Sequence, residues 1–344
     1  MRAAIVDAPN TAPRVVEVPD PEVPRHAALV RVRASGVCRS DWHAWVGHDP
    51  SVRFPHVHGH EFAGEVAALG DDVGSFAVGE RVTAPFCCGC GACRTCRDGH
   101  QQLCEREYQP GFDGWGSFAE LVMVPWADVN LARLPDDIAD EAAASLGCRF
   151  MTAFRGLVDE AGVRPGERVL VLGCGGVGLS SVMIASALGA QVIAVDLDEA
   201  KLEWARRFGA SVVVDAREHD PVAIAREVGD GGVDVAVDAL GSALTAAQGI
   251  RALRRRGRHL QLGLLLGRDA DPALPMQDVI RRELRVIGSH GMPARRYGAL
   301  FDFVRSAALP IDALVGERRS LDGVGEALAA MGRFTPLGVQ VVIP

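Results

Sequence analysis

The sequence lacks an excess of positive charge. Its 344 residues carry 36 lysines and arginines against 44 aspartates and glutamates, which gives a formal net charge of −8. Nucleic-acid-binding surfaces are usually basic because they neutralise phosphates, so this balance argues against a nucleic-acid partner. The conspicuous basic cluster comprises Arg254, Arg255, Arg256 and Arg258, and we expect it to be a solvated helix end.

The features of exported and membrane-spanning chains are also missing. The N-terminal stretch MRAAIVDAPNTAPRVVEVPD contains no apolar run followed by a small-residue cleavage site, which predicts a cytoplasmic protein. Residues Val169 to Val195 carry no charge and are long enough to cross a bilayer. Glycines interrupt this stretch at VLGCGGVGLS and LGA, a pattern that fits a strand, a turn and a helix better than a lipid-embedded helix. We therefore expect no membrane association.

Neither repeats nor low-complexity segments are present. An apolar content of 48% and a charged content of 23% are typical of globular proteins, and 344 residues are too many for one compact core. Up to about residue 150, short runs such as ALVRVRASGV and EFAGEVAALG alternate with Gly and Pro, which predicts strands and turns. From Val169 onward strands alternate with helices, which predicts an α/β fold with a parallel sheet covered on both faces.

A glycine-rich turn lies between the predicted strand RVLVL and the predicted helix LSSVMIA. Its residues fit the pattern G-x-G-x-x-G, which is weak alone but stronger at a strand-to-helix junction: Gly173, Cys174, Gly175, Gly176, Val177 and Gly178. The glycines allow a tight turn and close approach of a pyrophosphate to the helix N-terminus. Asp196 ends the next predicted strand, where a carboxylate binds ribose hydroxyls and repels a 2′-phosphate. This pattern indicates NAD binding, and the alternative role for Asp196 is to cap the following helix.

Cysteines gather in CGCGACRTCRDGHQQLC, residues Cys88 to Cys104. Structural disulfides do not persist in the cytoplasm, so metal binding or redox chemistry remains. Four of these thiols can enclose a structural zinc ion on one loop: Cys90, Cys93, Cys96 and Cys104. A thioredoxin-like redox pair is the alternative, although that motif expects a neighbouring βαβ unit, which lies far downstream here. Cys87 and Cys88 are surplus, and we expect them to pack as small apolar residues.

Three further residues suggest a second metal site. Cys38 lies in GVCRSDWH, His60 in GHEFAG and Cys148 in LGCRF. A lone histidine is usually structural, so this hypothesis depends on all three segments together. Two thiolates and one imidazole would leave the fourth position of zinc open to water or substrate, which is the catalytic form of a zinc site.

In chain order, the motifs GVCRSDWH, GHEFAGEV, the four-cysteine loop, LGCRFMTAF, GCGGVG and VDLDEAK extend over essentially the whole sequence. Together they resemble the zinc-dependent alcohol dehydrogenases of the medium-chain dehydrogenase/reductase superfamily. The resemblance implies a GroES-like, β-rich catalytic domain at residues 1–150, with a zinc lobe at about residues 87–105. It implies a Rossmann domain with a doubly wound parallel sheet at residues 151–289, and a return to the catalytic domain at residues 290–344. It also implies a homo-oligomer, either a dimer or a tetramer.

The same resemblance assigns roles to single residues. Cys38, His60 and Cys148 would hold the catalytic zinc, and the four-cysteine loop would hold a structural one, which makes two zinc ions per chain. Beside the metal, Asp41 would orient the zinc-bound histidine, and Glu61 would lie close to the ion. Ser40 and His43 would form a proton relay. Arg39 would contact the cofactor pyrophosphate, Lys201 would lie near the adenosine ribose, and Phe86 would form a wall of the substrate pocket. The alternative role for Asp41 is a helix N-cap.

Two departures from the family pattern bear on these assignments. Val339 follows Gly338 where the family often has Lys or Arg, so one expected phosphate contact is missing. His56 and His58 crowd the segment before His60, and we assign the ligand to His60 because it stands in the motif GHE.

The reaction implied by the resemblance is the reversible, NAD-linked oxidation of a small primary or secondary alcohol to an aldehyde or ketone. Zinc would act as a Lewis acid that allows an alkoxide to form, and hydride would pass to the nicotinamide. A polyol or aldehyde-specialised dehydrogenase on the same scaffold is the first alternative. A zinc-thiolate redox sensor is the second.

Overall fold

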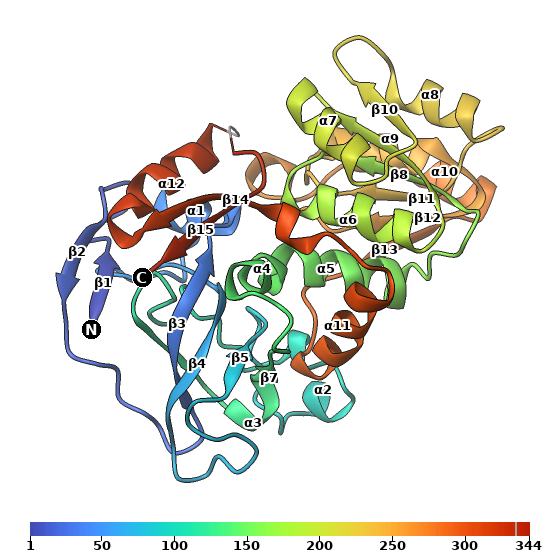
Figure 1. The fold of residues 1–344 in the computed structure, drawn as a ribbon. Helices are drawn as coiled ribbons and strands as arrows, with labels where there is room; N and C mark the ends of the chain where they lie inside the picture. Colours follow the sequence, from blue (N-terminus) through green and yellow to red (C-terminus); the bar gives the residue numbers. More distant parts are fainter. Residues whose placement is uncertain (334–335) are drawn as a thin grey trace. The chain divides into compact units, whose positions relative to one another are not determined.

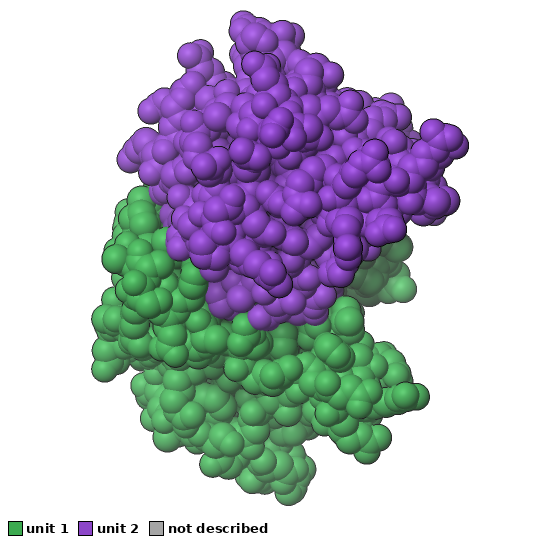
Figure 2. Space-filling model, turned by 90° about the vertical axis from the view of Figure 1, so that its right-hand side faces the viewer, with its two compact units in different colours: residues 1–151, 291–344 green, residues 152–290 purple. Residues whose placement is uncertain are grey.

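The computed structural model describes residues 1–333 and 336–344. The chain folds into two compact units, which Figure 2 shows in different colours. Unit 1 comprises Met1–Met151 and Gly291–Pro344, and unit 2 comprises Thr152–His290. In the described part of the chain, no helix is both long and apolar enough to cross a membrane.

Unit 1 is built on a mixed sheet with the strand order β14-β15-β3-β4-β5-β7 (Figure 1). Strand β6 also pairs with β3. All neighbouring strands of this sheet are antiparallel except β14 and β15. A separate hairpin joins β1 to β2. The strands of this unit are β1 (Arg2–Ile5), β2 (Arg14–Glu17), β3 (Ala28–Gly36), β4 (Glu61–Leu69), β5 (Arg81–Thr83), β6 (Leu121–Val124), β7 (Ala132–Arg133), β14 (Val315–Ser320) and β15 (Val339–Ile343).

The pairing of β3 with β4 positions the candidate site. Strand β3 reads ALVRVRASG, and its two arginines are exposed while the residues beside them are buried, as expected for a strand with one solvated face. Strand β4 runs antiparallel to it, with Gly36 opposite Glu61. Cys38 follows the end of β3 and His60 precedes the start of β4, so this register brings them to the same end of the sheet.

Helix α4 (Asp140–Ser145) packs against β3 and β4, and the turn that follows it is irregular. The chain from α4 to α5 passes through a π-helical turn at Leu146–Phe150, which carries Cys148. The α-helices of unit 1 are α1 (Arg39–Trp45), α2 (Arg94–Arg97), α3 (Ala127–Asn130), α4 (Asp140–Ser145), α11 (Tyr297–Ser306) and α12 (Val324–Gly332), and α5 (Met151–Phe154) begins at the unit boundary and continues in unit 2. Short 3-10 turns are η1 (Gln101–Leu103), η5 (Ala294–Arg296), η6 (Ile311–Leu314) and η7 (Leu321–Gly323).

Unit 2 is a six-stranded sheet with the order β10-β9-β8-β11-β12-β13, and every neighbouring pair is parallel. Its strands are β8 (Arg168–Leu172), β9 (Gln191–Asp196), β10 (Val212–Asp215), β11 (Val233–Asp238), β12 (Leu253–Gln261) and β13 (Arg285–Gly288). Its helical segments are the π-helical turn η3 (Arg155–Glu160), α6 (Gly176–Ala187), α7 (Glu199–Arg207), α8 (Pro221–Val228), α9 (Ala243–Ala252), η4 (Gly267–Asp269) and α10 (Met276–Arg282). This is the doubly wound Rossmann order, so the predicted fold class is confirmed.

The uncharged stretch from Val169 to Val195 forms most of β8, all of α6 and most of β9. The interpretation as a strand, a turn and a helix is therefore confirmed. Leu170, Ile193 and Ile250 belong to the buried cluster of this unit. The stretch is apolar because its two strands are central in a parallel sheet and buried on both faces.

The expectation of a helix end at the arginine cluster was wrong. Helix α9 ends at Ala252, and Arg254, Arg255 and Arg256 belong to β12. Strand β12 pairs in parallel with β11 at Leu253 and again from Arg258 onward, and the three arginines lie in the irregular part of the strand between these pairs. Their side chains are exposed as expected, and Nε of Arg254 lies 2.6 Å from a carboxylate oxygen of Asp234.

Two glycines in the turn after β8 should respond differently to an added methyl group. A Cβ atom on Gly178 would lie 1.7 Å from the backbone oxygen of Gly173, whereas one on Gly175 would meet no atom within 4 Å. We expect Gly178→Ala to destabilise unit 2 by about 3 kcal/mol, because the overlap is with backbone. Gly175→Ala should cost less than about 1 kcal/mol. Thermal unfolding followed by circular dichroism measures both, and equal midpoints would contradict this account of the turn.

Candidate active site and metal centres

Cys38, His60 and Cys148 meet in unit 1, together with Glu61. One ligand atom from each of these four residues lies within 4.8 Å of those of the other three. Cys38 follows β3, His60 immediately precedes β4, Glu61 is the first residue of β4, and Cys148 lies in the π-helical turn. The structure thus brings the three predicted ligands together from three distant parts of the chain.

The ring of His60 is held by Asp41. Its Nδ1 lies 2.8 Å from Oδ1 of Asp41, and neither side chain is exposed. Its Nε2 is buried and has no hydrogen-bond partner. An unsatisfied buried polar atom costs about 1–3 kcal/mol, and a metal ion would satisfy it. Two thiols and one imidazole nitrogen are a donor set that suits zinc, so the residues present fit the ion.

The N-cap of α1 is Cys38, so the alternative role of Asp41 as the N-cap was wrong; Asp41 is instead the third residue of the helix and completes a capping box. Its Oδ2 accepts a hydrogen bond from the backbone N–H of Cys38 at 2.8 Å, which closes the N-terminus of α1. Its Oδ1 faces His60 and also accepts the backbone N–H of Gly59 at 3.1 Å. The carboxylate therefore supports the N-terminus of the helix from its N3 position and fixes the orientation of the imidazole.

The two thiols of this cluster differ in acidity. A hydrogen bond from Cys148 and the nearby His60 outweigh burial and hold the pKa of Cys38 well below its usual value. The hydrogen bond to Cys38 and burial raise the pKa of Cys148 well above its usual value. Burial lowers the pKa of His60, but Asp41 and Cys38 together raise it well above its usual value. Cys38 is therefore the thiol that carries negative charge most readily.

Glu61 forms a buried ion pair with Arg149. Nε of Arg149 lies 3.1 Å from Oε1 of Glu61, and its Nη2 contacts Oε2. Burial raises the pKa of Glu61 to about 7, although Arg149 opposes this shift. Sequence reasoning did not identify Arg149. The available signal was a charged residue directly after the predicted ligand Cys148 in an otherwise apolar segment.

Ser40 and Arg39 begin helix α1. Oγ of Ser40 lies 3.8 Å from Sγ of Cys38. Nη1 of Arg39 donates to the backbone oxygen of Met331 at 2.6 Å, and the guanidinium lies 4.6 Å from the ring centroid of Trp42. Partial burial lowers the pKa of Arg39. The proton-relay and pyrophosphate roles of these two residues remain predictions.

His43 lies in the last turn of α1 and is partly buried. Its Nδ1 is 3.0 Å from Nδ1 of His48, a residue that sequence reasoning did not connect with the site. Burial, followed by the charge of Arg39, lowers the pKa of His43 to about 4. His43 is therefore neutral near pH 7 and available to accept a proton.

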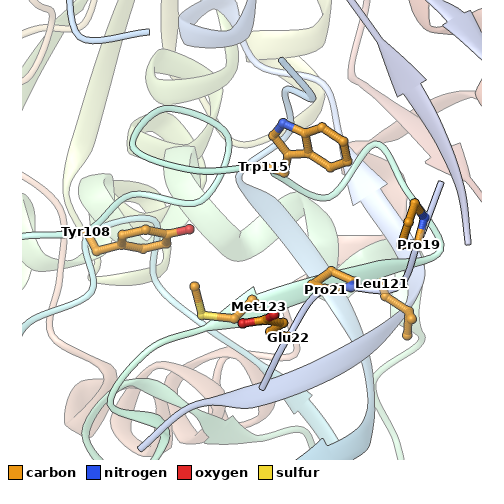
Figure 3. A pocket seen from close by; sticks show the side chains of 7 residues that line it. All are labelled: Pro19, Pro21, Glu22, Tyr108, Trp115, Leu121 and Met123. Carbon is orange, nitrogen blue, oxygen red and sulfur yellow. The ribbon is translucent and has the colours of Figure 1, made fainter. Parts of the chain in front are cut away.

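Aromatic rings flank His60. Phe86, the predicted pocket wall, is buried, and its ring is edge-on to His60 with centroids 6.1 Å apart. Phe112 lies at 5.5 Å in a similar orientation and was not predicted. A hollow of about 190 Å³ elsewhere in unit 1 contains none of the predicted site residues (Figure 3), and its lining consists of Pro19, Pro21, Glu22, Tyr108, Trp115, Leu121 and Met123. We therefore do not assign the reaction to this hollow.

The four predicted loop thiols also converge. Their four Sγ atoms all lie within 4.8 Å of one another. None of these sulfurs is in a disulfide, since all nine cysteines of the chain are free thiols. Backbone N–H groups point at these sulfurs, from Cys93 to Cys90 at 3.4 Å and from Cys90 to Cys104 at 3.3 Å. Burial raises the pKa of Cys90, but hydrogen bonds from the backbone outweigh it and lower the pKa to about 6. Nη2 of Arg106, which was not predicted, lies 3.1 Å from Sγ of Cys90.

Cys87 and Cys88 stand outside both clusters. Both are fully buried. Sγ of Cys88 lies 3.7 Å from the backbone oxygen of Pro85, and Sγ of Cys87 lies 3.8 Å from that of Met292. These contacts agree with the expected packing role, and burial raises the pKa of Cys88 well above its usual value.

The glycine-rich turn of unit 2 leads into helix α6, which begins at Gly176. Gly173 has a φ angle of +89°, a conformation that favours glycine. Oδ2 of Asp196 accepts the N–H of Cys174 in this turn at 2.7 Å, so the carboxylate lies beside the predicted pyrophosphate site. The N-cap of α7 is Asp198, whose carboxylate accepts the N–H of Ala200 at 2.9 Å. The capping alternative for Asp196 was therefore wrong.

Lys201, the predicted ribose neighbour, lies in the first turns of α7. It is the single lysine of the sequence. Its position two residues after the N-terminal residue of α7 places it on the segment that follows Asp196.

Two protein families match the chain. Residues 24–136 match the alcohol dehydrogenase GroES-like domain, and residues 176–306 match the zinc-binding dehydrogenase family. An alcohol dehydrogenase of Geobacillus stearothermophilus is 34% identical over 291 residues, 84% of each chain. A sorbitol dehydrogenase of Halalkalibacterium halodurans is 34% identical over 80% of this chain and 79% of its own. An L-threonine 3-dehydrogenase of Anaeromyxobacter dehalogenans is 33% identical over 92% of this chain and 90% of its own.

Solved structures give the same result. An alcohol dehydrogenase from Thermus sp. ATN1 has a TM-score of 0.92 at 30% identity, covering 100% of this chain and 99% of its own. A putative zinc-binding dehydrogenase from Sinorhizobium meliloti 1021, bound to NADP, has a TM-score of 0.87 at 32% identity, covering 100% and 99%. Sequence, fold and the clustered donor atoms agree, and the chain belongs to the zinc-type medium-chain dehydrogenase/reductase family.

Proposed function

We propose that this dehydrogenase oxidises a small primary or secondary alcohol to an aldehyde or ketone, reversibly, with NAD as the hydride acceptor. The observation that carries the proposal is the buried, unpartnered Nε2 of His60 beside the thiols of Cys38 and Cys148. Three protein donors leave one position of a tetrahedral ion open for substrate, whereas four close it.

Cys38, His60 and Cys148 would hold the catalytic ion. When bound there, zinc supplies Lewis acidity, which lowers the pKa of a hydroxyl group beside it. With zinc bound, Asp41 would hold the ring proton of His60 on Nδ1, and Nε2 would be the donor atom. Arg149 holds both carboxylate oxygens of Glu61, which leaves the three neutral or thiolate donors as the ligand set.

Ser40 and His43 would take the proton of the alcohol toward solvent. Ser40 lies beside Cys38, and its hydroxyl can both accept and donate a proton. His43 is neutral near pH 7 because its pKa is lowered to about 4. A proton that binds His43 is therefore released again quickly, as a residue that passes protons onward requires.

The cofactor would bind at the glycine-rich turn of unit 2. The N-terminus of α6 offers unpaired N–H groups to a pyrophosphate, and Gly175 leaves room for its approach. The carboxylate of Asp196 would accept the ribose hydroxyls and repel a 2′-phosphate. Because the Sinorhizobium meliloti relative is bound to NADP, the choice of NAD rests on Asp196 in this chain.

The substrate class has two candidates. The Geobacillus relative supports a simple alcohol, and the sorbitol dehydrogenase relative supports a polyol to the same degree, since both are 34% identical. A polyol site needs polar partners for several hydroxyl groups, whereas Phe86 and Phe112 beside His60 are apolar. These two rings favour the simple alcohol.

A substrate panel tests the proposal. The zinc-loaded protein is assayed for NAD reduction with ethanol, benzyl alcohol, 2-alkanols, sorbitol, L-threonine and hydroxymethyl-glutathione. We expect the highest kcat/KM with an apolar primary or secondary alcohol. A preference for sorbitol would establish the polyol alternative. Zinc-loaded protein that turns over no alcohol, but whose loop thiols oxidise reversibly, would support the redox sensor instead.

Zinc content should distinguish the two metal centres. We expect two zinc ions per chain in the parent and about one in each of the variants Cys148→Ser and Cys93→Ser. Loss of a ligand from the open site should abolish turnover and preserve the fold. Loss of a ligand from the closed loop should lower the thermal midpoint first, because metal binding there replaces a hydrophobic core. Elemental analysis, thermal unfolding and turnover are measured for all three proteins.

A parent with one zinc ion or none would contradict the two-site assignment. So would a Cys93→Ser variant with parental zinc content and stability. Cys88→Ser is the matched control, since Cys88 is a buried thiol of the same segment that belongs to neither cluster. It should keep both ions.

Cofactor choice should depend on Asp196. We expect Asp196→Ser to raise KM for NAD and lower KM for NADP, because the change removes both the ribose acceptor and the repulsion of a 2′-phosphate. Asp198→Ser is the matched control, since serine preserves the N-cap of α7. The ratio of kcat/KM for the two cofactors is the measurement. If both variants keep the parental ratio of kcat/KM for NAD and NADP, Asp196 does not determine the choice of cofactor.

A further inference from the structure

His48 is fixed beside His43 by the turn that ends α1. Gly47 has a φ angle of +82°, which reverses the chain after the helix. The N–H of His48 donates to the backbone oxygen of His43 at 2.9 Å, and the N–H of Gly47 donates to that of Ala44 at 3.1 Å. This pattern is a Schellman C-cap, which satisfies the last carbonyls of the helix. The turn therefore holds the residue five positions after His43 next to it.

The two imidazoles face each other through the same nitrogen. Their Nδ1 atoms are 3.0 Å apart, and the ring centroids are 5.3 Å apart. Both rings are edge-on to Trp42, at 4.8 Å for His43 and 5.5 Å for His48. At 3.0 Å one Nδ1 must carry a proton and the other must accept it. His43 is partly buried, whereas His48 is exposed.

We propose that His48 is the solvent-side member of the proton relay and accepts the proton that leaves His43. The inference rests on the proposed dehydrogenase function, since only alcohol oxidation delivers a proton to His43. His48 does not touch the reacting atoms and acts through His43.

The proton balance of the step is simple. A proton from the alcohol side binds Nε2 of His43, and the proton on its Nδ1 crosses to Nδ1 of His48. The proton on Nε2 of His48 then leaves to water. One proton enters, one leaves, and both rings are neutral again as the opposite tautomers. Solvent exchange at the two rings, or carbonyl reduction in the reverse direction, restores the first tautomers.

The surroundings of His43 favour onward transfer. Burial, Arg39 and His48 lower its pKa to about 4, and Cys38 opposes them. Helix α12, which packs against α1, contributes the Met331 carbonyl to Arg39, and its acidic residue Glu326 is paired with Arg319. A proton on His43 is therefore unstable and needs a nearby acceptor. The exposed ring of His48 lies within hydrogen-bond distance.

The test compares His48→Gln with the parent. Glutamine can still hydrogen-bond to His43 but cannot pass a proton on. In a buffer that exchanges protons poorly, we expect kcat for alcohol oxidation at pH 6–7 to fall at least about threefold. KM, zinc content and thermal midpoint should stay at parental values. The deficit should shrink as pH rises, because hydroxide replaces the missing acceptor, and added imidazole should restore kcat. His219→Gln, a change at an exposed histidine of unit 2, is the control and should have no effect.

Two further measurements separate this inference from the proposed function. The double variant His43→Gln/His48→Gln should be no slower than His43→Gln, since the two residues act in series. Imidazole ¹⁵N NMR of the parent should show the shared Nδ1 proton, and His48→Gln should lose that signal whether or not any alcohol is turned over. A shared proton in a protein that oxidises no alcohol would refute the function and leave the pair intact. A parental pH profile in His48→Gln, or additive losses in the double variant, would overturn the relay role of His48.

Discussion

The candidate catalytic site depends on the buried carboxylate of Asp41. It accepts hydrogen bonds from the backbone N–H groups of Cys38 and Gly59 and from Nδ1 of His60. It thus joins the segment after β3, the start of α1 and the segment before β4. A buried charge is expensive unless its oxygens are satisfied, and here every contact also positions a ligand or its neighbour. Because Asp41 occupies Nδ1, Nε2 is the ring nitrogen of His60 that a metal ion could bind.

The geometry around this carboxylate follows from the sheet. Gly36 lies opposite Glu61 in the β3–β4 pair, and a Cβ atom on Gly36 would lie 2.5 Å from Oε2 of Glu61. The absence of a side chain at that position leaves room for the buried pair of Glu61 and Arg149. The π-helical turn at Leu146–Phe150 then brings Cys148 to the same place. Extra residues in a helical turn re-aim side chains, and such turns are frequent at functional sites.

The four-cysteine loop has a different physical basis. Its small buried cluster consists of Cys90, Cys96 and Cys104, packed against Cys93 and Trp126. A lobe with so little apolar surface has little hydrophobic stabilisation of its own, so metal binding would supply much of its folding free energy. Arg106 and the backbone N–H groups around the sulfurs offset the charge of clustered thiolates. The two thiol sites therefore differ in origin, since one is local in sequence and the other joins distant segments.

That difference decides how much the sequence alone could determine. The spacing of Cys90, Cys93 and Cys96 and the glycine turn at Gly173 are local patterns, and periodicity predicted the parallel α/β unit. Arg149 and Phe112 were missed because their partners are distant in sequence, and His48 because no known motif pairs it with His43. Asp196 was left between two roles until the structure assigned the cap to Asp198. The arginines at 254–256 were misplaced because β12 begins at Leu253, and pairing of its residues on both sides of the arginines with β11 is not visible in the local sequence. The sequence by itself determined which donors exist and which turns they flank, while strand register and buried charge pairing, both non-local, decided which of them meet.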